Sequence, residues 1–374
     1  MRLWATSLIL SNKRQKQEIW ILVNGIHART QHRTHNLLTT SSAFSRISFM
    51  KKLITMAIIA STIAITTMPA QAALKSNTLK STTSNPTLAI LDTALDTSIQ
   101  SISSRVVAEV CILDWPSCPN GKSFMEGPGS SVLPMKFLAT NNFNHGTQMA
   151  SAAIAANPNI NIVFIRIVGN TSKGGVQTYG LNTLVNALTW VNNNKTKYNI
   201  VAVASSHATN APVIKRSATS AYCLPTAVDT AVSNLNNSGV PVFFPSGNSA
   251  GNPNMKGKIE WPACISQSIA VGGVETLNLD KPQVSLVSNY DVKLVDLWGE
   301  IQQPTIYPGN VSGYSYGTSV SVQVIAAKYV SLKVSKPTLT STELISLMKT
   351  ASDPVENSYG QNVYLFKLSK VING

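Results

Sequence analysis

Five short apolar runs, well separated along the chain, limit the folds that this sequence can adopt. They are nearly continuous in aliphatic and small residues instead of alternating with polar ones. Such runs are typical of strands that are buried on both faces of a parallel sheet. The runs are residues 86–92, 160–168, 199–205, 240–245 and 268–274. They predict a central, mostly parallel sheet.

Two stretches between these runs have helical periodicity. Residues 178–194 place apolar side chains three or four positions apart. Residues 224–239 do the same between Pro225 and Gly239, residue types favoured at the start and just beyond the end of a helix. Alternating strands and helices predict helices on both faces of the sheet. We therefore expect an α/β protein with three layers, α/β/α, around the mostly parallel sheet.

The N-terminal part of the chain predicts a leader. Residues 50–72 begin with Met50 and two lysines, continue with an apolar run and end in Ala-Gln-Ala, which is the layout of a secretory signal peptide. The run is short for a membrane span, and a retained membrane anchor is the alternative. We interpret residues 1–49, a basic extension, as a mis-assigned start or a disordered leader. We expect residues 73–374 to form a single domain, secreted or periplasmic.

The charge of the chain argues against nucleic acid as a partner. The net charge is +14, but residues 1–49 hold seven Lys/Arg and one Glu, and the signal segment adds two Lys. The remaining 302 residues carry 21 Lys/Arg and 15 Asp/Glu, a net charge near +6, without a basic run interleaved with aromatics. We expect no nucleic-acid partner, and no membrane contact after signal cleavage.

The four cysteines, Cys111, Cys118, Cys223 and Cys264, all lie beyond the signal segment. An even number of cysteines behind a signal peptide indicates two disulfides. Four cysteines allow three pairings, and proximity in the sequence favours Cys111–Cys118 with Cys223–Cys264. A metal site is the weaker interpretation, because the spacings lack a paired Cys-x-x-Cys pattern. We expect no metal.

Four potentially reactive side chains fall at predicted strand ends or helix starts. Asp92 ends the first apolar run, and Asn248 follows the run 240–245 in a Gly/Asn loop. His145 and Ser319 each open a helical run. Each residue alone has an ordinary interpretation as a cap or turn residue. In a parallel sheet, however, sites form at the carboxyl ends of strands, where these four side chains can meet.

In their order along the chain, these motifs resemble those of the subtilisin-like serine proteases, the subtilases. The resemblance is carried by Asp92-Thr93-Ala94, His145-Gly146-Thr147, Gly247-Asn248-Ser249 and Gly317-Thr318-Ser319, and it covers roughly residues 86–335. It implies a serine endopeptidase that acts on polypeptides. In that role Asp92 orients His145, His145 takes the proton of Ser319, and Asn248 stabilises the oxyanion.

The resemblance also assigns a substrate pocket and a backbone feature. It places Ser206, His207, Ala208 and Gly247 among the substrate-binding residues, although the family usually has Ser-Leu-Gly at 206–208. In the family, the step that matches Trp261–Pro262 often has a cis bond, so we expect one here.

The chain departs from the family pattern in three further places. Residues 320–323 read Val-Ser-Val-Gln where Met-Ala-Thr-Pro is usual, and Ala94 stands where Gly is common. Only 13 residues, 73–85, precede the first strand, so we expect no propeptide domain.

Two other functions compete with this interpretation. Residues 313–317 match the Gly-x-Ser-x-Gly elbow of esterases around Ser315, but no His follows His207, and residues 302–313 are interpreted as a loop. The esterase is therefore rejected. A subtilase-fold protein that binds peptides but cleaves them weakly or not at all is the main alternative.

We expect a monomer without a cofactor. Structural calcium is unsupported, because there is no clustered carboxylate loop.

Overall fold

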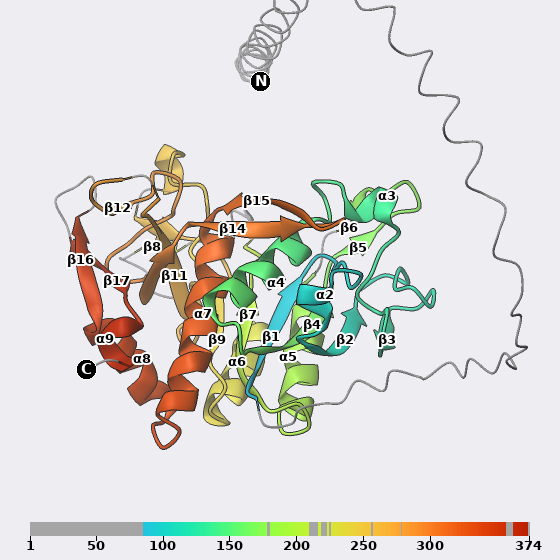
Figure 1. Ribbon diagram of the computed structural model, residues 1–374, viewed down its shortest axis with the longest axis horizontal. Coiled ribbons are helices and arrows are strands. Elements are labelled where there is room, and N and C mark those ends of the chain that lie inside the picture. The colour runs from blue at the N-terminus through green and yellow to red at the C-terminus, as the bar shows by residue number, and fades with distance from the viewer. Residues whose placement is uncertain are drawn as a thin grey trace, which may run out of the picture. The chain divides into compact units, whose positions relative to one another are not determined.

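A central sheet of eleven strands dominates the described part of the computed structural model (Figure 1). The structure describes residues 85–177, 180–208, 216–217, 223, 226–255, 257–277, 279–356 and 362–372. All of them belong to one unit, residues 76–374. The predicted basic extension and signal peptide lie outside the described residues.

The strand order places β1 near the middle of the sheet. The strands follow one another as β16 (Ser352–Glu356), β17 (Asn362–Phe366), β13 (Leu297–Glu300), β11 (Ile269–Glu275), β9 (Val242–Pro245), β7 (Ile200–Ser205), β1 (Thr87–Asp92), β4 (Asn161–Arg166), β2 (Val106–Ile112) and β3 (Phe124–Glu126), and β12 (Gln283–Val284) pairs with β11. The pairs from β17 to β2 are parallel. The pairs β16–β17, β2–β3 and β11–β12 are antiparallel.

Helices cover both faces of this sheet, and successive side chains of β1 pack against the helices on opposite faces. Ala89 and Leu91 belong to one core cluster with α5 (Leu181–Asn194) and α6 (Ala227–Asn237). Leu88 and Ile90 point to the other face, where they share a cluster with α4 (His145–Ala156), α7 (Thr318–Ser335) and α8 (Ser341–Thr350). The predicted three-layer α/β/α architecture is confirmed.

The two helices predicted from periodicity are α5 and α6. The Thr226 hydroxyl caps α6 in a capping box with Asp229, and Gly239 follows the helix at φ +81°. No described helix has the length and apolar character that crossing a bilayer would require.

The segment 302–313, interpreted above as a loop, forms most of a hairpin instead. Strands β14 (Gln302–Tyr307) and β15 (Val311–Tyr316) pair antiparallel, separate from the central sheet, and extend across α4 and α7 (Figure 1). Gly309 (φ +77°) and Asn310 (φ +61°) make the turn, because Gly and Asn tolerate positive φ. The apolar content of this segment is too low for the pattern of a buried strand.

Short elements complete the described fold. They are the helices α2 (Gln100–Ser103), α3 (Met135–Leu138) and α9 (Ser369–Ile372), a 3₁₀ turn (Pro253–Met255), and the strand pairs β5 (Gly169–Asn170) with β6 (Val176–Gln177) and β8 (Arg216–Ser217) with β10 (Lys258–Ile259).

Candidate active site

Three of the four predicted reactive residues line one cavity of about 420 Å³. His145 is the first residue of α4, Ser319 is the second residue of α7, and Asn248 follows β9. Asp92, the fourth, is the last residue of β1 and lies fully buried behind His145. The cavity is therefore built where central strands end and two helices begin, as expected for an α/β sheet.

Asp92 and His145 form a hydrogen-bonded pair. The Nδ1 atom of His145 lies 2.8 Å from Oδ1 of Asp92, and the same oxygen accepts the Thr93 N–H at 2.7 Å. Burial alone would raise the pKa of Asp92, but the attraction of His145 and its hydrogen bond lower that pKa to about 2. Burial would lower the pKa of His145, yet Asp92 raises it above its ordinary value. Asp92 is thus a permanent anion that favours the protonated imidazole.

Thr93 joins the end of β1 to the start of α4. Its hydroxyl donates to the Phe143 carbonyl at 3.0 Å and accepts the Gly146 N–H at 2.9 Å. Position 146 has no room for a side chain, because a Cβ there would collide with the Ala94 carbonyl oxygen. The chain segments around Asp92 and His145 are therefore in direct backbone contact, which fixes the ring beside the carboxylate.

Ser319 lies at the N-terminus of α7 after a sharp turn. Gly317 adopts φ +140°, a conformation that is accessible mainly to glycine. The Ser319 hydroxyl donates to the Ser206 carbonyl at 3.1 Å, and within the described residues no hydrogen bond joins it to His145. The hydroxyl would have to rotate to meet the imidazole.

Asn248 has a defined amide orientation. Its Oδ1 accepts the Thr318 N–H at 2.9 Å and the Thr318 hydroxyl at 3.0 Å. Since Oδ1 faces Thr318, the NH₂ group takes the other side of the amide, close to Gly317. The side chain thus offers N–H donors beside the Ser319 motif, which is what oxyanion binding requires.

The predicted substrate-binding residues divide into two groups. Ser206, His207 and Ala208 line the cavity. The His207 ring lies 6.1 Å from the His145 ring, centroid to centroid. Burial and repulsion from His145 lower the pKa of His207, against the attraction of Asp92. Gly247 is not among the described lining residues.

Sequence reasoning assigned no role to several lining residues, three of which it had quoted only as neighbours of the reactive residues. Glu260 is the chemically distinctive one, and the others are Thr93, Asn141, Asn142, Pro245, Ser249 and Thr318. The position of Glu260 directly before Trp261–Pro262 was the available signal. That peptide bond is cis, as the resemblance implied.

Gln323 occupies the position where the family usually has proline. Its side chain is fully buried in α7 and donates to the Ser206 hydroxyl at 2.7 Å. The carbonyl of the same Ser206 accepts the Ser319 hydroxyl. Gln323, which replaces the usual proline, therefore belongs to the hydrogen-bond network around Ser319.

A comparison with protein families decides the assignment. A model described as the subtilase family matches residues 83–364. The chain belongs to the subtilase family. It is therefore a serine-type peptidase, a hydrolase whose substrates are polypeptides.

Solved structures have the same fold as this subtilase. A cold adapted subtilisin-like serine proteinase is 19% identical, with a TM-score of 0.52 over 75% of this chain and 87% of that one. The S41 psychrophilic protease is 16% identical, with a TM-score of 0.54 over 72% and 84%. A lanthipeptide protease is 15% identical, with a TM-score of 0.54 over 77% and 87%. A search of curated proteins found no match.

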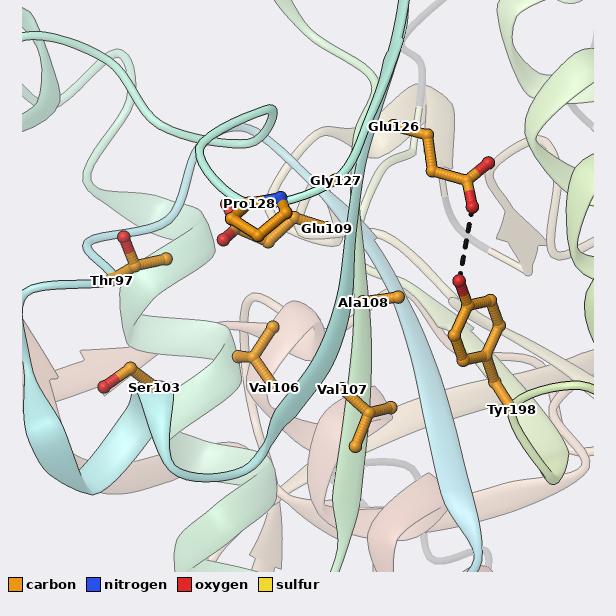
Figure 2. Close-up of a pocket in the computed structure, with 10 residues that line it drawn as sticks. All are labelled: Thr97, Ser103, Val106, Val107, Ala108, Glu109, Glu126, Gly127, Pro128 and Tyr198. Atoms are coloured by element: carbon orange, nitrogen blue, oxygen red, sulfur yellow. Dashed lines mark hydrogen bonds between the residues drawn. The ribbon is translucent and has the colours of Figure 1, made fainter. Parts of the chain in front are cut away.

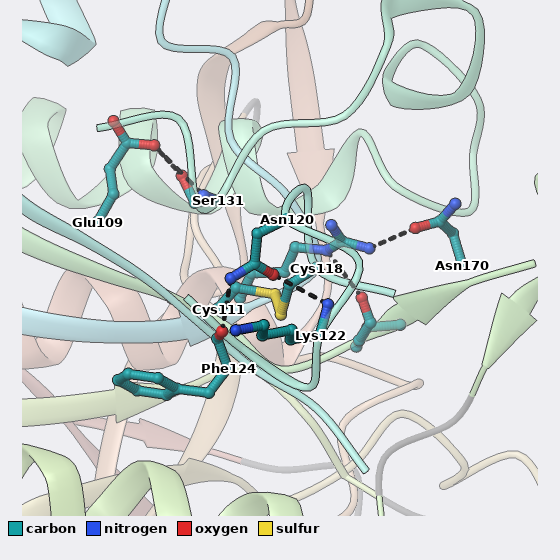
Figure 3. Close-up of a disulfide and its surroundings, with 10 residues drawn as sticks. Glu109, Cys111, Cys118, Asn120, Lys122, Phe124, Ser131 and Asn170 are labelled. Carbon is teal, nitrogen blue, oxygen red and sulfur yellow. Dashed lines mark hydrogen bonds between the residues drawn. A yellow bond between two sulfur atoms is a disulfide. The ribbon is translucent and has the colours of Figure 1, made fainter. Parts of the chain in front are cut away.

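Both predicted disulfides are present in this subtilase. Cys111–Cys118 closes a short loop after β2, and just beyond this loop the Asn120 side chain accepts the Lys122 N–H and donates to the Phe124 carbonyl (Figure 3). Cys223–Cys264 joins the segment before α6 to the segment after β10. The favoured pairing among the three possible ones is confirmed.

The hydrogen bonds described for Ser315 of this subtilase involve no base. Its buried hydroxyl lies 2.5 Å from Oε1 of Gln148 and 2.7 Å from the Thr305 hydroxyl. Both partners are neutral, and neither can take a proton as an imidazole does. The match of residues 313–317 to an esterase elbow is therefore a coincidence of the hairpin sequence.

Another cavity of the subtilase, about 220 Å³, lies along β2 (Figure 2). It is lined by residues 106–109, and by Glu126 and Tyr198, whose hydroxyl lies 3.2 Å from the Glu126 carboxylate. None of the predicted site residues lines it. In the part of the chain that the structure describes, no group of three or more His, Cys, Asp or Glu side chains could hold a metal ion.

Proposed function

We propose that this subtilase is an exported serine endopeptidase that uses Asp92, His145 and Ser319 as its triad. The observation that carries the proposal is the 2.8 Å contact between Asp92 and His145, at the cavity that Ser319 and Asn248 also line. The imidazole has a buried anion on one nitrogen, and its side chain is 33% exposed, so the ring is accessible to a substrate.

The proposed reaction begins with rotation of the Ser319 hydroxyl away from the Ser206 carbonyl and toward Nε2 of His145. As the oxygen of Ser319 attacks the substrate carbonyl carbon, His145 takes the hydroxyl proton. His145 then gives that proton to the amine nitrogen, the peptide bond breaks, and an acyl group stays on Ser319. Water hydrolyses this ester by the same proton transfers. The carboxylate of Asp92 stabilises the imidazolium in both steps.

The Asn248 amide and the Ser319 backbone N–H are the proposed donors to the oxyanion. Ser319 stands in the first turn of α7, where backbone N–H groups have no acceptor within the helix. The partial positive charge of that terminus also favours the developing negative charge. Such an amide side chain contributes about 2.7–4 kcal/mol to lowering the barrier in subtilisin itself, which is the worked example for this effect.

The same proposal includes export of the protein and the extent of its catalytic domain. The signal-peptide pattern of residues 50–72 supports removal of the leader, and the two disulfides suit an oxidising compartment. We assign residues 73–374 to one catalytic domain that acts in the periplasm or outside the cell as a monomer.

A fluorophosphonate probe tests the proposed nucleophile. The purified protein should be labelled at Ser319 and should cleave unfolded polypeptides. Ser319→Ala should abolish both labelling and cleavage, because the proposed reaction needs the Ser319 hydroxyl as its nucleophile. Ser315→Ala is the control and should keep both activities.

The alternative function predicts a different result. If the wild-type protein binds peptides but does not cleave them and is not labelled by the probe, it is a peptide-binding protein with a subtilase fold. Labelling that survives Ser319→Ala and disappears in Ser315→Ala would contradict the assignment.

A further inference from the structure

Gln323 lies one helical turn beyond Ser319 in α7, so both side chains can reach the same neighbouring segment. That segment is Ser206, the residue that follows β7. The Gln323 amide donates to the Ser206 hydroxyl at 2.7 Å, and the Ser319 hydroxyl donates to the Ser206 carbonyl at 3.1 Å. Two described hydrogen bonds therefore join the beginning of α7 to one residue at the end of a central strand.

The proposed reaction affects these two hydrogen bonds differently. The Ser319 hydroxyl must leave the Ser206 carbonyl to meet His145, so the first bond is broken before attack. The bond from Gln323 involves neither this hydroxyl nor the imidazole, and it can persist. While the hydroxyl turns, the Gln323 amide is thus the described donor that still holds the beginning of α7 to Ser206. Its contribution should be largest at the step in which Ser319 attacks.

The amide of Gln323 does not favour the stability of the fold. The residue is fully buried, and its Oε1 atom has no hydrogen-bond partner within the described residues. A buried acceptor without a donor lowers the free energy of unfolding, and an apolar side chain of similar size would avoid that loss. Local conflicts of this kind are expected mainly at functional positions. The burial of this amide therefore indicates a role in the site.

We propose that Gln323 is a positioning residue for the nucleophile, which keeps the beginning of α7 in place through the Ser206 hydroxyl while Ser319 turns to His145. The proposal rests on the function proposed above, because it assumes that Ser319 attacks the substrate. Gln323 is not among the described residues that line the cavity, so it acts through Ser206 and not on the substrate. Its loss should therefore lower kcat and leave KM near the wild-type value.

Gln323→Leu tests this role, because it removes the amide and fills the same space with an apolar side chain. We expect kcat and kcat/KM on peptides to fall equally, by about 3- to 10-fold, as for the loss of one neutral hydrogen bond. The midpoint of unfolding in urea should stay the same or rise, because the unpaired Oε1 is removed. A residue with a purely structural role would lose stability and activity together.

A second variant tests whether Gln323 acts through Ser206. Ser206→Ala removes the acceptor of the same hydrogen bond and should also lower kcat. Adding Gln323→Leu to Ser206→Ala should lower kcat no further, because the bond is already lost. The double variant should also be more stable than Ser206→Ala alone, since that single variant leaves the Gln323 amide without its acceptor. Losses of kcat that add up would contradict the proposed coupling.

Tyr329→Phe is the matched control within α7. The Tyr329 side chain is fully buried, and its hydroxyl also has no hydrogen-bond partner within the described residues. Its replacement removes an unpaired polar group from the same helix, far along the chain from Ser319. It should leave kcat unchanged and should not lower the midpoint of unfolding. Labelling of Ser319 by a small fluorophosphonate in every variant shows that the site is assembled.

The outcomes distinguish this inference from the proposed function. A labelled Gln323→Leu protein with wild-type kcat overturns the role of Gln323, while the endopeptidase stands. A Gln323→Leu protein that does not fold, or that loses stability and kcat in parallel, also overturns it and assigns Gln323 to the core. A wild-type protein that is not labelled and cuts no peptide contradicts the endopeptidase itself.

Discussion

At the scale of single residues, the buried Asp92 determines how His145 responds to pH. Its pKa near 2 keeps it ionised at any pH where the protein would be assayed. The attraction of Asp92 and its hydrogen bond raise the pKa of His145, whereas repulsion from His145 helps to lower the pKa of His207. The effect of the carboxylate is larger than that of burial, since the pKa of His145 is raised although burial alone would lower it.

The pH profile of the proposed endopeptidase follows from this pair. His145 accepts a proton only when it is neutral, so kcat/KM should rise as the pH rises through the pKa of His145. Asp92→Asn removes the attraction, so burial then lowers that pKa, and the acidic limb should move to lower pH. The same change should reduce kcat on the order of 10⁴-fold. Peptide hydrolysis measured between acidic and alkaline pH checks both effects; an acidic limb that stays in place would contradict the role of Asp92.

The individual site residues differ in how far the sequence could reveal them. Asp92, His145, Asn248 and Ser319 stand in short motifs whose order is informative, and the structure brings them together. Glu260 stands in no such motif. Its position directly before Trp261–Pro262 was the one local signal, and the packing of Gly247 against its carboxyl group is visible in the structure alone. Gly247, which the resemblance places among the substrate-binding residues, packs against the Glu260 carboxyl group in the structure.

At the scale of elements, the start of α7 depends on one glycine. Gly317 precedes the helix at φ +140°, and a Cβ there would lie 3.2 Å from Nδ2 of Asn248. Position 317 therefore influences two things at once, the entry of the chain into α7 and the position of the Asn248 amide.

Gly317→Ala should therefore affect stability and activity together. The strained backbone should lower the free energy of unfolding by about 1–3 kcal/mol. Displacement of the Asn248 amide should lower kcat roughly 10- to 100-fold in folded protein. Gly239→Ala is the matched control, because Gly239 also has positive φ but a Cβ at that position would meet no atom within 4 Å. Urea unfolding and peptide hydrolysis should show a loss of stability in both variants and a loss of kcat in Gly317→Ala alone.

Strands and helices could be predicted from the sequence where their apolar residues follow a single regular pattern. The buried runs of the central sheet and the apolar stripes of α5 and α6 are visible in the chain because one rule of periodicity explains each of them. The β14–β15 hairpin could not be predicted in this way. Its inward polar side chains hydrogen-bond to one another and to α4, as Thr305 does to Ser315 and Ser315 to Gln148. Side-chain hydrogen bonding replaces apolar burial there, and periodicity does not detect it.

At the scale of the whole molecule, two disulfides restrict the chain to different extents. Cys223 and Cys264 are 41 residues apart, whereas Cys111 and Cys118 are seven apart. The longer loop also contains Asn248 and Glu260, so its closure restricts the part of the chain that supplies one side of the cavity.

Replacing each pair with alanine should separate these contributions. In the chain-entropy model, loss of Cys223–Cys264 should lower the free energy of unfolding by about 4 kcal/mol, and loss of Cys111–Cys118 by about 2 kcal/mol. Equilibrium unfolding in urea of both double variants measures the difference. Equal losses would show that loop length does not govern the stabilisation.

The four groups of the proposed reaction come from distant positions, with Asp92 and Ser319 separated by 227 residues of sequence. Ser319 stands on α7, a helix whose side chains are buried for most of its length between the sheet and α4. In the proposed reaction, a chain in which α7 has not yet docked therefore has no nucleophile to place beside His145. Cleavage by this triad then requires that the whole stretch from Asp92 to Ser319 has folded, so a fragment that ends before α7 would carry His145 and Asp92 without activity.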